Sequence, residues 1–341
     1  MTTGKLRQLS HSKLATLPNP LAPDEGNACA RKYAYSYVWR VPRAADASAI
    51  AGTAFHAALQ EDGAHKLVNN IDLSYGELLK HARMVLDLEI KKLDAGYLDR
   101  DNMIARLESM LRVYHQKIQP FYAPSRMPEQ HFDYREIEGV AFVGYVDAFF
   151  SVREDSTFDI GDWKNTKYFR NPKWIGTRFD KDWIDDPDHA AQATAYMMAY
   201  PQASAVRFLV FACDPLYPDR AEYKRYTIAR DATREADYKR RIVATVESLE
   251  EMEATGNYNA TVSNLCAYCP FVGVCKAGQA ALAAMGKEAQ VETPRHEVKC
   301  AACEDDTAIV TGYIADEDGA RHQVTCRSCG VVAEQPIAKG K

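Results

Sequence analysis

The chain has 341 residues, of which 47% are hydrophobic and 26% are charged, proportions typical of a soluble globular protein. No apolar run approaches the roughly 18 residues of a membrane span, and the N-terminus lacks the apolar core of a secretory signal. We therefore expect a cytoplasmic protein without a membrane partner. The formal net charge of −5 excludes general attraction to nucleic acid, so any nucleic-acid binding requires a local basic patch.

The N-terminal third combines a basic, aromatic segment with predicted helices. Residues 29–37 read CARKYAYSY, and residues 47–61 form a run of small residues that predicts a helix. That helix carries His56 within the sequence GTAFH. A single histidine on an apolar helix is more often a core residue than a metal ligand. Residues 74–93 and 103–118 have helical apolar spacing and are interpreted as structural helices.

The central stretch, residues 142–167, predicts two β-strands around a four-residue turn at 153–156. Counting back from the turn places Asp147 opposite Asp162. Strand alternation places Lys164 on the same face as Asp162. Opposed carboxylates repel each other, and a hard divalent cation with oxygen ligands would stabilise them. The alternative is a surface hairpin with exposed charges.

Alternating helices and strands follow the hairpin. Residues 167–183 are basic with interleaved aromatic side chains, a composition that suits single-stranded nucleic acid but also a solvated loop. Residues 189–200 predict a helix on which Gln192 and Tyr196 share a face. Residues 207–213 and 222–228 predict strands, and residues 231–255 predict a long helix. These elements indicate an α/β domain with a mixed sheet.

Three cysteines cluster near the end of this domain, as Cys266, Cys269 and Cys275. Three thiolates leave a tetrahedral site one ligand short, and Cys29 is the candidate fourth ligand. Cysteine spacing does not separate an iron–sulfur cluster from a zinc ion.

A second cysteine set has the spacing of a zinc ribbon, two CxxC pairs joined by a β-hairpin with a turn at residues 316–319. Its four predicted Zn²⁺ ligands are Cys300, Cys303, Cys326 and Cys329. Acidic residues follow the first pair at 304–306 and occupy the hairpin turn at 316–318, which disfavours direct DNA binding by the ribbon. The remaining cysteine, Cys213, lies in an apolar strand and is interpreted as a core residue.

The order of these motifs resembles the RecB-like branch of the PD-(D/E)XK nuclease superfamily. The pattern Gly144-x-x-Asp147, the Asp162-x-Lys164 strand, the Gln192-x-x-x-Tyr196 helix and the first cysteine set occur together over residues 28–276. The cysteine pattern is similar to that of the iron–sulfur members, which include the AddB subunit and CRISPR-associated exonucleases. One departure is Ala30, where many members have proline.

The resemblance implies a restriction-endonuclease-like α/β fold, with a mixed central sheet flanked by helices and its termini linked through an iron–sulfur cluster. The expected domains are a nuclease domain at residues 1–285, a linker at 286–299 and a zinc ribbon at 300–341. The implied cofactors are Mg²⁺ or Mn²⁺, a [4Fe–4S] cluster and Zn²⁺.

The resemblance also assigns roles to residues. The metal ligands would be His56, Asp147, Asp162 and the carbonyl of Trp163. Lys164 would orient or help deprotonate the attacking water, and Gln192 and Tyr196 would position Lys164 or the phosphate. The [4Fe–4S] ligands would be Cys29, Cys266, Cys269 and Cys275.

The implied function is a metal-dependent DNA exonuclease that acts on single-stranded ends in phage or bacterial recombination, repair or defence. A helicase or recombination protein is an expected partner. The alternative is a non-catalytic DNA-binding platform, with the ribbon recruiting a partner. Asp147, Asp162 and Lys164 together favour the enzyme, because a platform needs none of them.

Overall fold

The computed structural model describes most of the chain between residues 7 and 336. The described residues are 7–22, 28–41, 46–93, 95, 98–137, 140–150, 152–171, 181–288, 297–298, 308–316, 319–326 and 332–336. From residue 297 onward the description covers the backbone only. Among the helices of these residues, none is long and apolar enough to cross a membrane.

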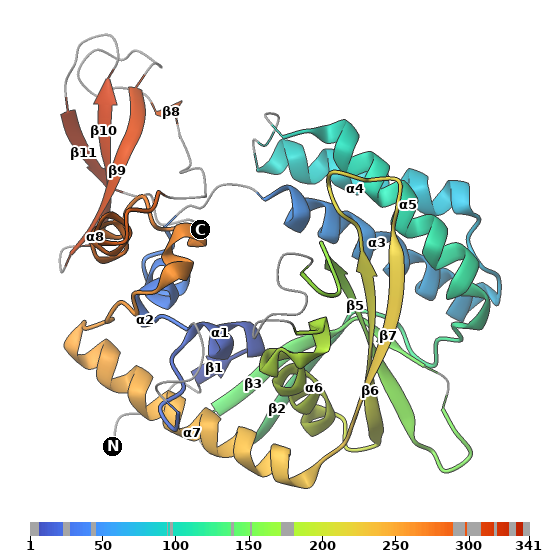
Figure 1. The fold of residues 1–341 in the computed structure, drawn as a ribbon. Coiled ribbons are helices and arrows are strands. Elements are labelled where there is room, and N and C mark those ends of the chain that lie inside the picture. The colour runs from blue at the N-terminus through green and yellow to red at the C-terminus, as the bar shows by residue number, and fades with distance from the viewer. Residues whose placement is uncertain are drawn as a thin grey trace. The chain divides into compact units, whose positions relative to one another are not determined.

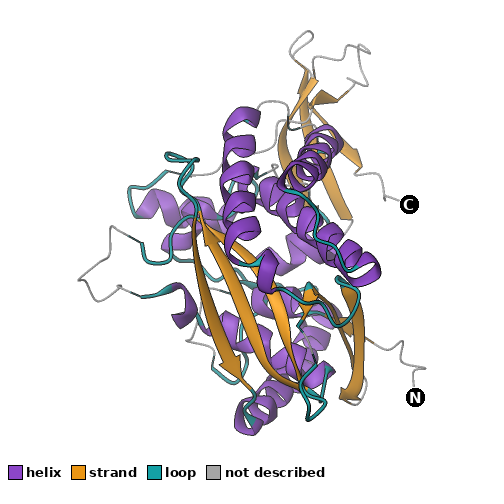
Figure 2. Ribbon diagram, turned by 90° about the vertical axis from the view of Figure 1, so that its right-hand side faces the viewer, coloured by secondary structure: helices purple, strands orange, loops and turns teal. Residues whose placement is uncertain are grey.

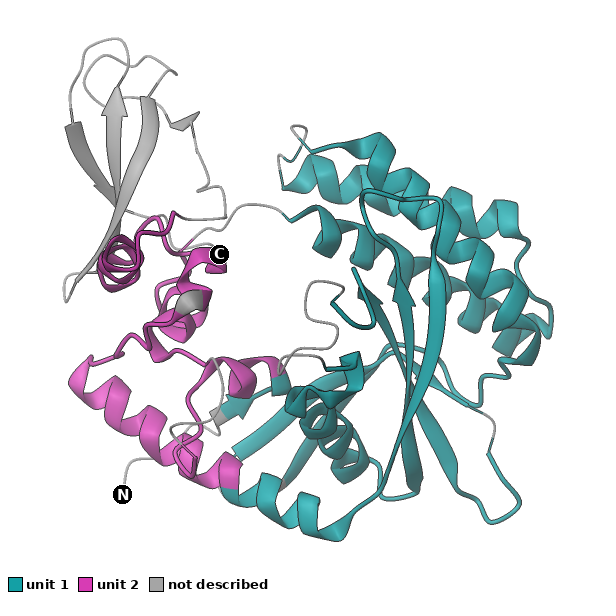
Figure 3. Ribbon diagram, in the orientation of Figure 1, with its two compact units in different colours: residues 1–11, 45–240 teal, residues 12–44, 241–341 magenta. Residues whose placement is uncertain are grey.

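Two compact units divide the chain, and both are discontinuous in sequence (Figure 3). Unit 1 comprises residues 1–11 and 45–240, and unit 2 comprises residues 12–44 and 241–341. The predicted linker at 286–299 lies largely outside the described residues. The boundary between a nuclease domain and a zinc ribbon therefore stays a prediction.

Unit 1 contains two small mixed sheets rather than the single central sheet expected from the sequence. In the first, with strand order β1-β3-β2, the strands are β1 Arg7–Leu9, β2 Gln130–Ile137 and β3 Val140–Val146. In the second, with order β4-β5-β6-β7, they are β4 Ala148–Phe149, β5 Phe158–Thr166, β6 Ala203–Ala212 and β7 Glu222–Ala229. β1 is parallel to β3 and β5 is parallel to β6, whereas the other neighbours are antiparallel. A mixed α/β architecture is thus confirmed.

The chain passes from the first sheet to the second at Asp147, the one residue between β3 and β4. Ala148 pairs with Gly161, and the same antiparallel register continued by one residue sets Asp147 opposite Asp162, as predicted. The turn of this hairpin is closed by Ser156, whose φ is +64°. The division into two sheets therefore occurs at a predicted site residue.

Three helices pack on one face of the β4–β7 sheet (Figures 1 and 2). They are α3 Ala47–Asn69, α4 Tyr75–Lys92 and α5 Arg100–Lys117. Each begins at a capping side chain that accepts backbone hydrogen bonds, provided by Asp46, Ser74 and Asp99. The three predicted helices are confirmed, and the first continues eight residues beyond the predicted end at residue 61, as far as Asn69.

The core beneath these helices contains Trp163 of β5 and Leu209 and Phe211 of β6, which alternate with residues of the other face. Trp163 is 2% exposed. Burying side chains of this size stabilises the fold by about 1.5–3 kcal/mol each. Cys213 joins this core, as predicted. One face of β5 is thereby anchored, so the side chains of its other face have fixed positions.

Helix α6, Pro187–Ala199, covers the opposite face of this sheet (Figure 1). It begins with Asp186 as N-cap and Pro187 in the first turn, both favourable for helix initiation. α7 spans Ala232–Thr255. The predictions of β6, β7, α6 and α7 are confirmed within a few residues. Unit 1 also contains the short 3₁₀ helices η2 Gln119–Phe121 and η3 Trp183–Asp185.

Unit 2 joins an N-terminal helical segment to the C-terminal region. Its helices include α2 Ala30–Tyr33, the π-helical turn η1 Ala34–Val38, the 3₁₀ helix η4 Asn264–Tyr268 and α8 Lys276–Ala284. α1, His11–Thr16, begins at the unit boundary. Tyr33 and Ala34 pack against Leu249 and Tyr258, so residues distant in sequence share one core.

A four-stranded sheet with order β11-β10-β9-β8 lies near the C-terminus. Its strands are β8 Glu297–Val298, β9 Ala308–Asp316, β10 Gly319–Cys326 and β11 Val332–Pro336. β9 and β10 form the predicted antiparallel hairpin. The zinc ligands Cys300, Cys303 and Cys329 lie outside the described residues, and the side chain of Cys326 is not described, so the zinc site stays a prediction.

Candidate functional site

The first candidate site lies where β3 gives way to β4. Asp147 is held there by its Oδ2 atom, which accepts a hydrogen bond of 2.9 Å from the Trp163 backbone N–H. His56 of α3 reaches the same oxygen, with Nδ1 at 3.4 Å. The predicted residues His56 and Asp147 are therefore brought together. The Trp163 group beside them is its N–H, and the predicted role of its carbonyl as a ligand stays a prediction.

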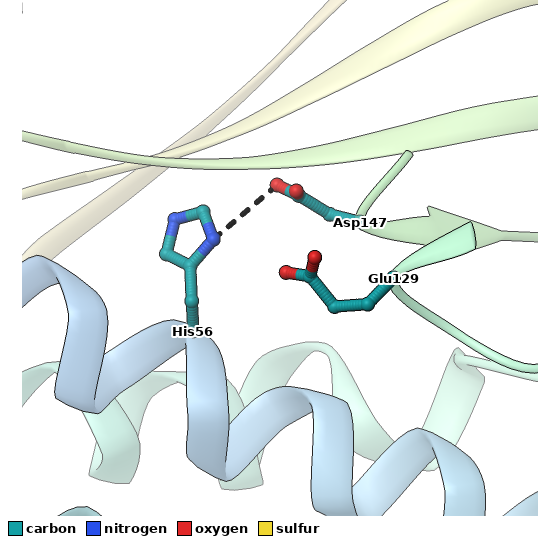
Figure 4. Close-up of side chains that lie close together, drawn as sticks. All are labelled: His56, Glu129 and Asp147. Carbon is teal, nitrogen blue, oxygen red and sulfur yellow. Dashed lines mark ion pairs between the residues drawn. The ribbon is translucent and has the colours of Figure 1, made fainter. Parts of the chain in front are cut away.

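Glu129 is a third member of this group that the sequence analysis missed (Figure 4). One ligand atom from each of His56, Glu129 and Asp147 lies within 4.8 Å of the other two. Glu129 donates a 3.3 Å backbone hydrogen bond to the Asp147 carbonyl and has a φ of +56°. Positive φ is uncommon for residues other than glycine and marks a position constrained by its surroundings. Glu129 directly precedes β2, so only the pairing of β2 with β3 places it beside Asp147.

The donor set of this group fits a divalent cation. Two carboxylates and one imidazole are ligands used by Mn²⁺ and related ions, and carboxylates are the ligands that Mg²⁺ prefers. All three residues are only partly exposed, so a bound ion would be partly withdrawn from water. The structure adds Glu129 to the predicted ligands, whereas Asp162 lies outside this group.

Asp162 is instead the centre of a separate hydrogen-bond network and is 0% exposed. Its Oδ1 lies 2.6 Å from the Nζ of Lys164. Its Oδ2 accepts hydrogen bonds from Gln192 Nε2, at 3.0 Å, and from the Tyr196 hydroxyl, at 2.9 Å. Gln192 also donates to the Tyr196 hydroxyl, at 2.8 Å. Gln192 and Tyr196 were predicted to position Lys164 or the phosphate, and their direct partner here is Asp162, whose other oxygen lies beside Lys164.

The carboxylates of Asp147 and Asp162 interact electrostatically across the hairpin. Burial raises the pKa of Asp147 to about 6, and the charge of Asp162 acts in the same direction, partly offset by His56 and Lys164. Burial alone would lower the pKa of Lys164, but Asp162 and Asp147 outweigh it and raise that pKa. Lys164 is thus an ammonium group at neutral pH, and it can donate hydrogen bonds to an anionic substrate.

A steric constraint explains why residue 144 of the Gly-x-x-Asp pattern is glycine. Phe132 lies directly opposite on β2, and a Cβ added to Gly144 would lie 2.6 Å from its ring. That ring packs edge-on against Tyr196, with centroids 6.1 Å apart. Glycine therefore lets Phe132 reach across the strand and support the helix residue that binds Asp162. Gly52 differs, because a Cβ there would make only an ordinary 3.6 Å contact.

The basic and aromatic segment after β5 is described only in part. Lys167 and Tyr168 both bind Asp214, through an ion pair and a hydrogen bond. Trp183 stacks on His189 at the start of α6. Residues 172–180 lie outside the described residues, so nucleic-acid binding by this segment stays a prediction.

The second candidate site is a cavity of about 230 Å³ in unit 2. All four cysteines predicted to bind one metal group line it, namely Cys29, Cys266, Cys269 and Cys275. The Thr261 N–H donates to Cys29 Sγ and the Gly278 N–H to Cys275 Sγ, both at 3.4 Å. Arg31 and Lys32 also line the cavity, so its surroundings favour negatively charged sulfur.

Burial raises the pKa of Cys269, which opposes a free thiolate there. Metal binding would overcome this effect, because metal ligands are thiolates. The cavity therefore combines four soft ligands, backbone N–H donors to sulfur and nearby cations, which are the features of a thiolate-bound metal group.

Comparisons with known proteins identify a family for this chain. The family model for the PD-(D/E)XK nuclease superfamily matches residues 19–276. No curated protein matches the sequence. The solved structure of a proposed exonuclease from Eubacterium rectale is similar in fold, with a TM-score of 0.50 and 12% identity, over 79% of this chain and 89% of that one. An alkaline exonuclease from Laribacter hongkongensis gives a TM-score of 0.31 and 16% identity, over 60% of this chain and 96% of that one.

Proposed function

Since the chain belongs to the PD-(D/E)XK nuclease superfamily, we propose that it is a metal-dependent DNA exonuclease acting on single-stranded ends. The observation that carries this proposal is the convergence of His56, Glu129 and Asp147 beside the Asp162–Lys164 pair. The expected setting is phage or bacterial recombination, repair or defence, with a helicase or recombination protein as partner.

In this proposal the residues divide the work between metal binding and substrate binding. His56, Glu129 and Asp147 hold the divalent cation, and the predicted contributions of Asp162 and the Trp163 carbonyl complete its ligands. When bound, Mg²⁺ or Mn²⁺ supplies an activated water and stabilises charge on the scissile phosphate. Lys164 donates hydrogen bonds to the phosphate or to the attacking water.

Gln192 and Tyr196 act as positioning residues rather than as contacts to the phosphate. Both donate to the same oxygen of Asp162, which leaves the other oxygen to Lys164. Burial, followed by the charge of Asp162, holds the pKa of Tyr196 well above its usual range, so its hydroxyl keeps its proton and remains a donor. The pair thereby fixes the rotamer of Asp162 and, through it, the place of Lys164.

The direct test is cleavage of end-labelled single-stranded oligonucleotides with Mg²⁺ or Mn²⁺, and with EDTA as the metal-free control. We expect stepwise shortening from one end, and loss of cleavage in Asp162→Ala. Asp155→Ala, in the exposed turn of the same hairpin, is the matched control and should cut normally. Wild-type protein that binds DNA without cutting any strand would instead support the non-catalytic platform.

The four cysteines of unit 2 are proposed to hold a [4Fe–4S] cluster. A tetrahedral zinc site with Zn–S bonds of about 2.3 Å requires sulfur atoms only about 3.8 Å apart. Among the described residues, no three of these thiol sulfurs lie within 4.8 Å of one another. Both this spacing and the cavity volume favour a group larger than a single ion.

An absorption spectrum and metal analysis of anaerobically purified protein test this assignment. About four irons per chain with a broad visible band support the cluster. Stoichiometric zinc without colour in Cys300→Ala, which lacks a predicted ribbon ligand, would show that the cavity binds zinc instead. The ribbon itself is proposed to bind Zn²⁺ and to contact a partner protein.

A further inference from the structure

An aromatic pair lies on β2 and β3 beside the metal-ligand group. His131 of β2 stands directly opposite Tyr145 of β3. Tyr145 precedes Asp147 by two residues, and His131 follows Glu129 by two. The Glu129 N–H donates to the Asp147 carbonyl and so continues the register of this pair toward the metal ligands. Two residues of extended backbone span about 7 Å, so the pair adjoins the metal-ligand group.

The pair is exposed although its neighbours are buried. Tyr145 is 58% exposed, whereas Val146 is fully buried and Phe132, next to His131, is 7% exposed. The two rings meet edge to face, with centroids 5.1 Å apart and an interplanar angle of 66°. This cross-strand contact restrains Tyr145 while its ring stays accessible to a ligand.

We propose that Tyr145, held by His131, is a stacking platform for the nucleobase next to the phosphate that is cleaved. The inference rests on the proposed nuclease function and adds a residue that contacts the base. Because Tyr145 is two residues from the metal ligand Asp147, a base stacked on its ring would belong to a nucleotide beside the phosphate at the metal-ligand group. Aromatic stacking is sequence-tolerant, because every base offers a π-face.

The platform gives a physical basis for a preference for single strands. A base inside a duplex has both faces covered by its neighbours and must be unstacked before it can reach an aromatic side chain. A base at a single-stranded end meets Tyr145 without that cost. Tyr145 therefore selects unpaired ends, and the metal-ligand group acts on the adjoining phosphate.

Three variants and one modified substrate test the platform. Tyr145→Ala should lower kcat/KM on single-stranded DNA about 10-fold, while Tyr145→Phe should stay within about 2-fold of wild type, because stacking needs the ring only. Tyr217→Ala is the matched control, since Tyr217 is 54% exposed in the loop between β6 and β7. It should behave as wild type.

The substrate test removes the base instead of the tyrosine. An abasic nucleotide at the position whose base would stack on Tyr145 should lower kcat/KM of the wild-type protein about 10-fold. The same substrate should leave kcat/KM of Tyr145→Ala unchanged. Full activity of Tyr145→Ala, or additive losses in that variant and the abasic substrate, would overturn the platform.

A binding measurement in EDTA separates this proposal from the nuclease proposal. 2-Aminopurine next to the end of a single strand should be quenched by wild-type protein and by Tyr145→Phe, and not by Tyr145→Ala. If the protein cuts no DNA but shows this quenching, the platform stands and the nuclease proposal fails. Equal fluorescence with wild type and Tyr145→Ala would overturn the platform whether or not DNA is cut.

Discussion

The carboxylate site and the cysteine cavity differ in how far apart their residues lie in the sequence. Asp147 and Asp162 face each other across one hairpin, whereas the hydrogen bond from Thr261 to Cys29 joins residues 232 positions apart. The carboxylates already have an internal counter-ion in Lys164, and the cysteine sulfurs accept hydrogen bonds from backbone N–H groups. Changes in the first site should therefore affect chemistry, and changes in the second should affect folding.

The largest expected effect is the loss of cleavage in Lys164→Ala. Removing a residue that donates to the reacting groups typically costs about 10²–10⁴ in rate. Asp162 keeps its hydrogen bonds from Gln192 and Tyr196, so the fold should survive. Single-turnover cleavage and circular dichroism measure both effects, with Lys92→Ala, 70% exposed on α4, as the control. Near-normal cleavage by Lys164→Ala would remove Lys164 from the catalytic residues.

Cys269→Ala should act on stability first. In the chain-entropy model, a cross-link spanning more than 200 residues contributes up to about 5 kcal/mol, an upper guide. We expect loss of iron, a melting temperature lower by about 10 °C, and reduced activity as a consequence. Cys213→Ala, which removes a buried thiol outside the cavity, is the matched control and should keep its colour. A coloured Cys269→Ala with an unchanged melting temperature would contradict the ligand assignment.

The raised pKa of Asp147 predicts a pH-dependent stability in the absence of metal. Folding moves this pKa from 3.8 to about 6, so the folded state binds the proton more tightly than the unfolded state. Stability from this group is therefore present at low pH and is lost as the pH rises towards 6, by about 3 kcal/mol in all. Urea unfolding in EDTA between pH 3.5 and 7 should show this loss in wild type but not in Asp147→Asn. Parallel pH profiles for the two proteins would disprove it.

Gly144→Ala should destabilise unit 1 moderately. The added methyl group meets the Phe132 ring at 2.6 Å, and overpacking of this kind costs about 1–3 kcal/mol. Gly52→Ala is an informative control, because its contact is ordinary and alanine favours a helix by about 1 kcal/mol. Chemical denaturation should show a lower free energy of unfolding for Gly144→Ala and a higher one for Gly52→Ala. A loss of stability in Gly52→Ala equal to that in Gly144→Ala would contradict the steric argument.

The smallest expected effect follows from removing residues 286–341. None of the residues proposed for the carboxylate site or the cysteine cavity lies in that segment. Cleavage of a short oligonucleotide and iron content should both remain within about 2-fold of the full chain, since structural zinc sites fold by their own metal binding. A soluble, iron-containing truncation that cannot cut would show that the ribbon contributes to catalysis.

Local patterns in the sequence predicted most of the secondary structure and the hairpin register. Alternation and a four-residue turn were sufficient to set Asp147 opposite Asp162, because a strand's side-chain period leaves few alternatives. The helix face shared by Gln192 and Tyr196 was equally predictable, since it depends only on the four-residue spacing.

Features that depend on tertiary contacts could not be predicted from the sequence. The switch between sheets at Asp147 and the positive φ of Glu129 arise from how strands meet, and no local pattern encodes either. No sequence motif singled out Glu129. The direct partner of Gln192 and Tyr196, Asp162, was not predictable either, because a shared helix face does not specify which atom on the facing strand receives the hydrogen bonds.

The discontinuity of unit 2 has a consequence for how the protein is made. Cys29 leaves the ribosome early, but the backbone donor to its sulfur, Thr261, is 232 residues behind it. At translation rates of about 5–20 residues per second, this delay lasts roughly 10–50 s. During that interval the early thiol is exposed to oxidants and to free metal ions. The proposed metal group, which needs all four cysteines, would therefore be inserted only after residue 275 has emerged, as a late step in the biosynthesis of the protein.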